Sequence, residues 1–174
     1  MTMKTRNLLL ILLSVILSVA VFTACKVGYS FTGASISPSV KTFTVPYFPN
    51  RARLVNPNLS QLFTEGLQEK LVKQTSLNQI TDGGDLEYTG QITEYEVRPM
   101  NIQQGDLAAQ NRLTIGVKIK FTNTKDHEQD WEKSFSAYED FDSNNSLSDI
   151  EGELVPLIIT KLTDDIFNAS VANW

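Results

Sequence analysis

The residue types that most often do chemistry in proteins are few in this sequence, and His127 is its only histidine. It lies in a polar stretch between Asp126 and Glu128. Zinc needs three or four well-placed ligands, and one histidine among neighbouring carboxylates is a poor set. A Ser–His–Asp triad is available by composition, but the sequence has no Gly-x-Ser-x-Gly turn to present the serine. We therefore interpret His127 as a solvated turn residue and expect no metal site.

Two groups of acidic residues could supply paired carboxylates for catalysis. They are Glu94 with Glu96, and Glu139 with Asp140 and Asp142. Exposed strands and loops commonly carry such charges, and nothing in the sequence marks a carboxyl group with a raised pKa. The glycine pair in 82–85 is not followed by Lys-Ser or Lys-Thr, so it is no phosphate-binding loop. We expect a protein that is not an enzyme and holds no cofactor.

Lys118 and Lys120 stand out because they alternate with apolar residues in the clearest strand pattern of the chain. Side chains two residues apart in a strand point to the same face. Arg112 lies at the entrance to this strand. The three cations could bind the phosphates of lipid A or an acidic wall of a partner protein. The alternative is ordinary solvation of a half-buried sheet, in which lysines also protect edges.

The only cysteine, Cys25, follows a segment that differs in kind from the rest of the sequence. Two basic residues near the start precede an uncharged run of 15 residues, 8–22. This run is short for a transmembrane helix, which needs about 20 apolar residues. A basic start, a short apolar run and small residues near its end are typical of a secretory signal peptide. We predict that residues 1–24 are a signal peptide, with a transmembrane anchor as the alternative.

The residues before Cys25 resemble a lipobox, the site where bacterial lipoprotein signal peptidase cleaves before a lipid-modified cysteine. Thr23 and Ala24 are small, as the motif requires, whereas Phe22 stands where leucine is usual. A lone thiol in an oxidising compartment is a liability unless its sulfur is used, and acylation uses it. We predict lipidation of Cys25, with an incidental cysteine as the alternative. Lys26 is compatible with sorting to the outer membrane, because aspartate there favours inner-membrane retention.

Loss of residues 1–24 removes Lys4 and Arg6 and leaves 13 basic and 20 acidic side chains, a net charge of about −7. Such a balance argues against nucleic acid as a partner, because phosphate contacts need clustered lysine and arginine. It also argues against membrane binding through a polybasic segment. The 150 remaining residues can bury one core without metal or disulfide. We predict a single domain, 25–174.

Alternating apolar residues predict the strands of one sheet. Two short strands come first, at 29–33 and 41–48, and Pro46 makes the second an edge strand or a strand end. In the next strand the alternation that starts at Leu86 changes parity near Thr93-Glu94, which predicts a β-bulge there.

A hairpin is predicted after that bulged strand. Five alternating apolar residues mark a strand at 113–121, and Trp131, Phe135 and Ala137 mark the next. The seven-residue connection between them predicts an antiparallel pair.

Two helices complete the pattern. The first follows Asn56 or Asn58 as N-cap, and Gly66 on its apolar stripe indicates close approach to another backbone. The stripe itself consists of Leu59, Leu62, Phe63, Leu67 and Leu71. The second starts with a capping-box spacing at Ser148–Glu151, and Pro156 should kink it or mark its true start. We predict an α+β fold with two helices packed on one face of a mostly antiparallel, about four-stranded sheet.

Several short motifs, in this order and spacing, resemble the LptE family of outer-membrane lipoproteins. They are Tyr29-Ser30-Phe31, Val55-Asn56-Pro57-Asn58-Leu59-Ser60-Gln61, Gly84-Asp85-Leu86, Asp165-Ile166-Phe167-Asn168 and the final Trp174. The resemblance covers nearly all of the mature chain. It implies two helices on one face of a four-stranded sheet, as the pattern does.

The same resemblance implies a function. LptE proteins are partners of the LptD β-barrel: they plug it, support its assembly and help lipopolysaccharide reach the outer leaflet. No catalytic residue carries over, and Cys25 transfers as the lipidation site. Lys118, Lys120 and Arg112 become candidate lipopolysaccharide-binding residues. Two other readings remain open: a pilotin-like lipoprotein that serves a secretion barrel, and a small periplasmic hydrolase.

The lipidation site gives the first testable prediction. In Cys25→Ser the sulfur that would carry the lipid is gone, so we expect an unprocessed precursor that is not labelled by palmitate in growing cells. Ser14→Ala, inside the apolar run, is the control and should be processed and labelled normally. Equal labelling of Cys25→Ser and the wild type would contradict lipidation at this residue.

Overall fold

The computed structural model describes residues 36–54, 56–100 and 109–172. Cys25 and the strand predicted at 29–33 lie outside the described residues. The elements follow in this order: β1 (Thr42–Thr44), α2 (Leu59–Gln74), β2 (Asn78–Gln79), β3 (Leu86–Pro99), β4 (Gln110–Asn123), the 3-10 turn η1 (His127–Gln129), β5 (Trp131–Asp142), α3 (Leu147–Phe167) and the π-helical turn η2 (Asn168–Ala172).

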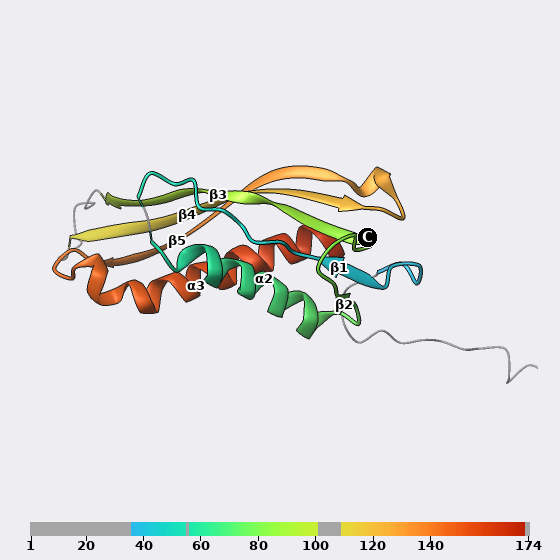
Figure 1. Ribbon diagram of the computed structural model, residues 1–174. Helices are drawn as coiled ribbons and strands as arrows, with labels where there is room; N and C mark the ends of the chain where they lie inside the picture. The colour runs from blue at the N-terminus through green and yellow to red at the C-terminus, as the bar shows by residue number, and fades with distance from the viewer. Residues whose placement is uncertain (1–35, 55, 101–108, 173–174) are drawn as a thin grey trace, which may run out of the picture. The chain divides into compact units, whose positions relative to one another are not determined.

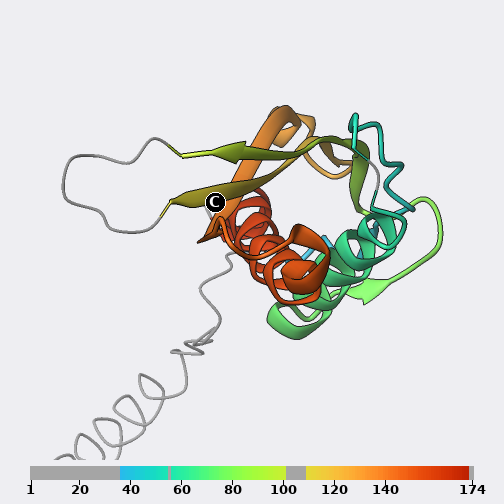
Figure 2. The same ribbon diagram turned by 90° about the vertical axis from the view of Figure 1, so that its left-hand side faces the viewer.

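In the described part of the chain, five strands form one sheet in the order β2-β1-β3-β4-β5. Both helices lie against one face of this sheet (Figures 1 and 2). β3, β4 and β5 are antiparallel to one another, whereas the short β1 is parallel to both of its neighbours. The predicted α+β fold is confirmed. The additional strand is β2, whose two residues are too few to leave an alternating pattern.

β1 is shorter than predicted and lies inside the sheet, between β2 and β3. It ends at Thr44, so Pro46 marks a strand end and not an edge strand. The chain then continues beside β3: the N–H of Arg51 donates to the carbonyl of Ile92 at 2.8 Å, and the N–H of Ile92 donates to that of Pro49 at 3.0 Å.

The register of β3 against β4 shifts between Ile92 and Glu94, which confirms the predicted bulge. Thr93 is the extra residue. Because the bulge changes the parity of the strand, Tyr88 and Ile92 before it and Tyr95 after it are all buried. A strand whose apolar residues change parity can therefore keep them all on the core side.

α2 contributes four fully buried residues of the predicted stripe, Leu59, Phe63, Leu67 and Leu71, whereas Leu62 is 39% exposed. Its N-cap is Asn58. Gly66 faces α3, where an added Cβ would lie 2.9 Å from Cγ2 of Ile159. The close approach predicted at Gly66 is thus real, but the neighbour is a side chain and not a backbone.

α3 begins at Leu147 with Ser146 as N-cap, so the capping box predicted at Ser148 is wrong by two residues. In a capping box the side chain of Glu151 would bond to the backbone at the helix start. It instead contacts the hydroxyl of Tyr95 on β3. Burial, together with this hydrogen bond, raises the pKa of Tyr95. The helix runs on through Pro156, which therefore does not mark its start. No helix among the residues described is both long and apolar enough to cross a membrane.

Asp85, at the start of β3, holds three parts of the chain together. Its carboxylate accepts hydrogen bonds from the N–H groups of Lys41 at 2.7 Å and Thr42 at 3.1 Å, just at β1. The same carboxylate binds Nζ of Lys125, in the β4–β5 turn, at 2.9 Å. Its carbonyl accepts the N–H of Thr124 at 2.9 Å. The Lys125 ammonium and these backbone donors hold the pKa of Asp85 well below its usual range.

Gly84 allows this contact because it lies directly against β1. A Cβ at Gly84 would be 2.7 Å from the carbonyl carbon of Phe43 and from the nitrogen of Thr44. The N–H of Gly84 donates to Oγ1 of Thr44 at 3.0 Å. Any side chain at Gly84 would therefore separate β1 from the start of β3.

The packing of α2 can be tested at Leu67, which is fully buried between helix and sheet. We expect Leu67→Ala to lower the free energy of unfolding by roughly 2–5 kcal/mol, because it leaves a cavity. Leu62→Ala on the exposed side of the same helix should cost less than about 1 kcal/mol. Denaturant unfolding of both variants measures the difference, and equal small losses would show that α2 does not pack as described.

The Asp85 contact predicts a pH dependence of stability. Its pKa is lower in the folded than in the unfolded chain, so its contribution is fully present above the unfolded value of about 3.9. It is lost as the pH falls through the folded value. At neutral pH we expect Asp85→Asn to cost roughly 2 kcal/mol, the range of hydrogen bonds to a charged group. The difference between wild type and variant should shrink below about pH 4.

Unfolding in denaturant between pH 7 and pH 2.5 measures this difference. Asp82→Asn removes the same charge from an exposed position in the same turn and serves as the control. A loss in Asp85→Asn that stays constant down to pH 2.5 would contradict the ionic role of this carboxylate.

Candidate functional site

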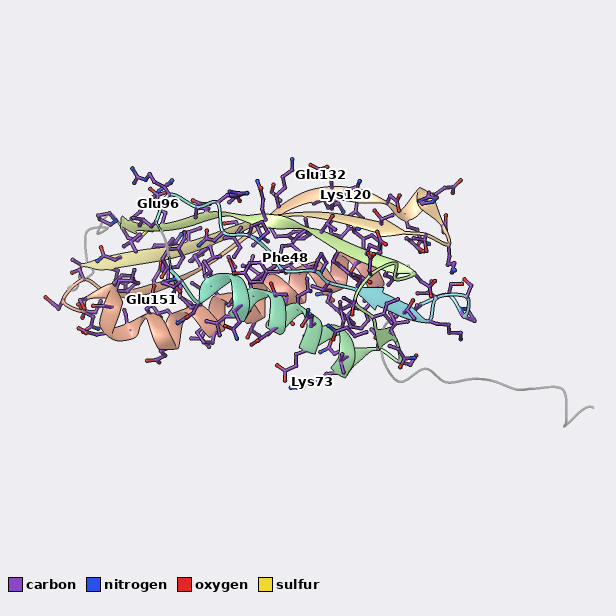
Figure 3. The ribbon with its side chains drawn as sticks, viewed as in Figure 1. Phe48, Lys73, Glu96, Lys120, Glu132 and Glu151 are labelled. Carbon is purple, nitrogen blue, oxygen red and sulfur yellow. The ribbon has the colours of Figure 1, made fainter. Side chains whose placement is uncertain are left out.

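The face of the sheet that points away from the helices is polar. On β4 the residues between Leu113 and Phe121 alternate, with the apolar ones buried and Lys118 and Lys120 exposed. In the register of the sheet, Lys118 lies between Gln91 and Ser134, and Lys120 lies between Thr89 and Glu132. Lys120 and Glu132 both project away from the helix layer in Figure 3. We call Lys118, Lys120 and Glu132 the outer-face cluster.

Within the outer-face cluster the charges are partly matched. Lys118 forms an ion pair with Glu132, and each side chain is 51% exposed. The hydrogen bond from Lys118 and the charges of Lys118 and Lys120 lower the pKa of Glu132. Lys120 forms no ion pair with another residue that the structure describes. The cluster thus has two cations and one carboxylate, and one cation is left to bind an additional anion.

Arg112 lies on the same face but not in the same cluster. It is six residues from Lys118 along β4, which is about 20 Å in a strand. Its guanidinium forms two hydrogen bonds with the Asp140 carboxylate, at 2.7 and 2.9 Å, and lies 3.5 Å from the centre of the Tyr138 ring. The hydrogen bond from Arg112 lowers the pKa of Asp140. The structure therefore separates Arg112 from the two lysines with which the sequence grouped it.

His127 lies in η1, the turn between β4 and β5, as predicted. Its Nδ1 is 2.9 Å from Oδ2 of Asp130, whose other carboxylate oxygen accepts the N–H of Asn123 at 2.7 Å. These contacts close the turn. Nowhere in 36–54, 56–100 or 109–172 do three His, Cys, Asp or Glu side chains come together as metal ligands.

Most of the acidic residues considered for catalysis are paired with cations, whereas Asp142 accepts hydrogen bonds from Asn144. Glu96 binds Arg98 at 2.7 Å, and Glu139 binds Lys161 at 2.8 Å. Glu94 lies near the same arginine, at 3.9 Å. These ion pairs occupy carboxylate oxygens that a general acid or base would have to offer to a substrate.

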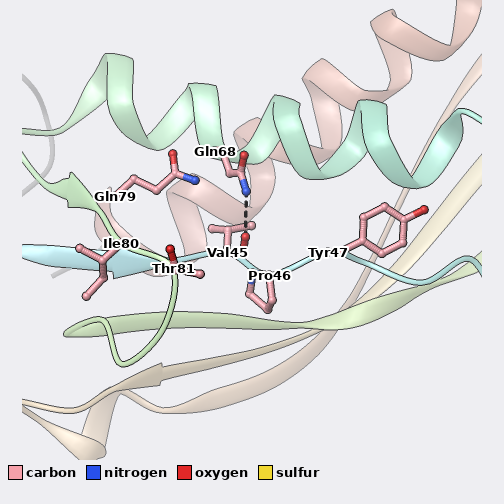
Figure 4. A pocket seen from close by; sticks show the side chains of 7 residues that line it. All are labelled: Val45, Pro46, Tyr47, Gln68, Gln79, Ile80 and Thr81. Atoms are coloured by element: carbon pink, nitrogen blue, oxygen red, sulfur yellow. Dashed lines mark hydrogen bonds between the residues drawn. The ribbon is translucent and has the colours of Figure 1, made fainter.

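Two grooves at the edges of the sheet had no signal in the sequence. The β1 groove, of about 550 Å³, is lined by residues that lie far apart in the chain (Figure 4). They are Val45, Pro46 and Tyr47 after β1, Gln68 on α2, and Gln79, Ile80 and Thr81 at β2. The β5 groove, of about 420 Å³, is lined by Ser136, Ala137 and Tyr138 on β5 and by Lys161, Asp164 and Asp165 on α3. Those of these residues that the sequence analysis named, Pro46, Ala137 and Asp165, were named for strand pairing or family resemblance and not for a groove.

Fold and surface together define an α+β domain with a charged outer sheet face and a groove at each sheet edge. Its fold is similar to that of a minor lipoprotein from Acinetobacter baumannii, with a TM-score of 0.51 and 15% identity over 78% of this chain and 95% of that one. It is also similar to the hypothetical protein CT253 from Chlamydia trachomatis, with a TM-score of 0.50 and 12% identity over 72% and 93%. At such identities the likeness concerns the fold alone.

The sequence also matches the LptE family, described as Lipopolysaccharide-assembly, over residues 40–170. This match spans most of the chain and nearly all of the described domain. The chain therefore belongs to the LptE family of lipopolysaccharide-assembly proteins, as its motifs suggested. Comparison with curated proteins finds no match.

Proposed function

We propose that this chain is the lipoprotein partner of an LptD-like outer-membrane β-barrel. It plugs the barrel, supports its assembly and helps to insert lipopolysaccharide into the outer leaflet. The observation that carries the proposal is the family match over residues 40–170, which takes in both helices and all five described strands. Glu96 and Glu139 are engaged in ion pairs, and His127 is engaged in a turn. Their contacts therefore support a binding role and not a catalytic one.

The proposal includes an anchor. The signal peptide, 1–24, is removed, and the acylated Cys25 holds the domain at the outer membrane, on the periplasmic side or inside the barrel lumen. Each buried methylene of an acyl chain contributes about 0.8 kcal/mol, so several chains give a durable attachment. Ten residues, 26–35, then connect the lipid to the first described residue, Ile36.

The outer-face cluster is the proposed contact for lipopolysaccharide phosphates. Lys120 is free of ion pairs with the described residues, and Lys118 is held only by an exposed pair with Glu132. Exposed pairs contribute about 0–1 kcal/mol, so a phosphate can displace Glu132 from Lys118. Arg112 is no part of the outer-face cluster, and for it to bind lipopolysaccharide a phosphate would have to replace its two-bond pair with Asp140.

The double change Lys118→Glu with Lys120→Glu tests the site. We expect lipopolysaccharide binding by the purified full-length protein in detergent to weaken ten-fold or more, since a charge-assisted contact to phosphate contributes about 1.5–3 kcal/mol. Stability should change little, because both side chains are exposed. The variant should still co-purify with its barrel from outer membranes.

Two matched changes sharpen this test. Lys73→Glu alters an exposed lysine on α2, on the opposite side of the molecule in Figure 3, and should leave affinity unchanged. Glu132→Gln frees Lys118 and should leave binding equal or tighter. Unchanged affinity in a folded Lys118→Glu/Lys120→Glu variant would remove these lysines from the site. Failure of the wild-type chain to co-purify with any LptD-like barrel would overturn the proposed function itself.

A further inference from the structure

β5 is an edge strand, and half of its backbone groups point away from the sheet. The N–H of Ser143, just after β5, donates to the carbonyl of Ala109, just before β4, at 3.0 Å. Because backbone groups of successive residues in a strand point to opposite sides, the odd-numbered residues of β5 are the ones that bond to β4. The even-numbered residues therefore point outward. On that side the backbones of Ser134 and Ser136 bond to no other residue in the described ranges. Such an open edge can pair with an additional strand.

The β5 groove lies directly beside this open edge. One wall is the strand itself, at Ser136, Ala137 and Tyr138, and the other is α3. A helix that runs beside a strand edge is the arrangement in which several domain families bind extended peptides by strand addition. The small side chain of Ala137 leaves room between strand and helix, and Ser136 and Tyr138 offer their outward backbone groups.

A lysine already occupies one of these backbone acceptors. Nζ of Lys161, on α3, donates to the outward carbonyl of Tyr138 at 3.1 Å and pairs with the Glu139 carboxylate at 2.8 Å. Its ammonium thus stands where the N–H of an added strand would donate. The Lys161 side chain is 52% exposed, so the contact is weakened by solvent and can be displaced.

Beside the β1 groove, at the other end of the sheet, the free side of β1 is already covered by β2. The carbonyls of Lys41 and Phe43 accept the N–H groups of Asn78 and Ile80, both at 2.9 Å. The next acceptor in that ladder, Val45, takes the side-chain amide of Gln68 at 2.8 Å (Figure 4).

After that amide the run of acceptors along β1 ends. Pro46 has no N–H to give, and proline within an edge stops further pairing. Of the two grooves, the β5 groove is therefore the one that leaves a continuous run of backbone donors and acceptors.

We propose that the β5 groove binds an extended, basic polypeptide segment by strand addition to β5. The segment is expected to be basic because the groove offers it negative charges. Asp165 is exposed in the groove wall, and displacement of Lys161 leaves Glu139 without its cation. Asp164 beside them pairs with Lys70. A lysine or arginine of the incoming segment replaces the Lys161 ammonium, and its backbone replaces the Lys161 hydrogen bond to Tyr138. This site is separate from the outer-face cluster and does not rest on lipopolysaccharide binding.

The experiment uses the full-length protein in detergent and a synthetic peptide, acetyl-Lys-Thr-Val-Thr-Val-Lys-amide. Hydrogen exchange of the Ser134 and Ser136 amides, which point outward, should slow when the peptide is added. Lys161→Met keeps the apolar stem and removes the competing ammonium, so it should bind the peptide about ten-fold tighter, which corresponds to about 1.4 kcal/mol. The same peptide with glutamate in place of both lysines should bind at least ten-fold more weakly.

Two controls separate strand addition from non-specific binding. A peptide methylated on its central backbone nitrogens cannot form the ladder and should not protect Ser134 or Ser136. Ser134→Pro removes one outward N–H without loss of a bond to β4 and should abolish binding, with its fold checked by circular dichroism. Equal binding of the methylated peptide, no protection at Ser134 and Ser136, or protection at Val45 and Tyr47 instead would overturn the proposal.

Discussion

The carboxylate of Asp85 joins three segments that are distant in sequence: the start of β1, the start of β3 and the turn after β4. The position of β1 beside β3 depends on this contact, because β1 has only three residues and few ladder hydrogen bonds of its own. A carboxylate that accepts backbone N–H groups can hold a short parallel strand where the ladder alone would be weak. Gly84 removes the steric obstacle, and Asp85 supplies the bond.

This contact gives a physical meaning to one of the motifs on which the family resemblance rests. Gly84-Asp85-Leu86 combines a residue without a side chain, a fixed anion and a fully buried leucine that opens β3. The sequence alone could identify a turn there, because glycine and aspartate are turn formers. It could not identify the partner of Asp85, because Lys41 and Thr42 are more than forty residues away and backbone donors leave no mark in a sequence.

The predictions that held were those set by local periodicity. The bulge after Ile92, the β4–β5 pairing and the buried stripe of α2 follow from alternation or from helical spacing, which local sequence contains. The predictions that failed depended on distant partners. Glu151 was expected to cap its own helix and contacts Tyr95 on the sheet. The role of Arg112 in lipopolysaccharide binding stays a prediction, but its partner Asp140 could not be identified from the sequence. The two grooves were missed for the same reason, since each combines residues of a helix with a strand edge.

The outer-face cluster also indicates what kind of binding such a surface can support. The chain is acidic, and Lys118 already has a carboxylate partner in Glu132, so the proposed phosphate would have to replace one anion by another at Lys118. At Lys118 the net gain from such an exchange is small, because both ion pairs are exposed and screened by salt, so most of the proposed binding energy comes from Lys120. Under the proposed function, a headgroup bound at this cluster would be released more readily than from a deep cluster of cations without a carboxylate. Such release would suit a protein that passes lipopolysaccharide onward.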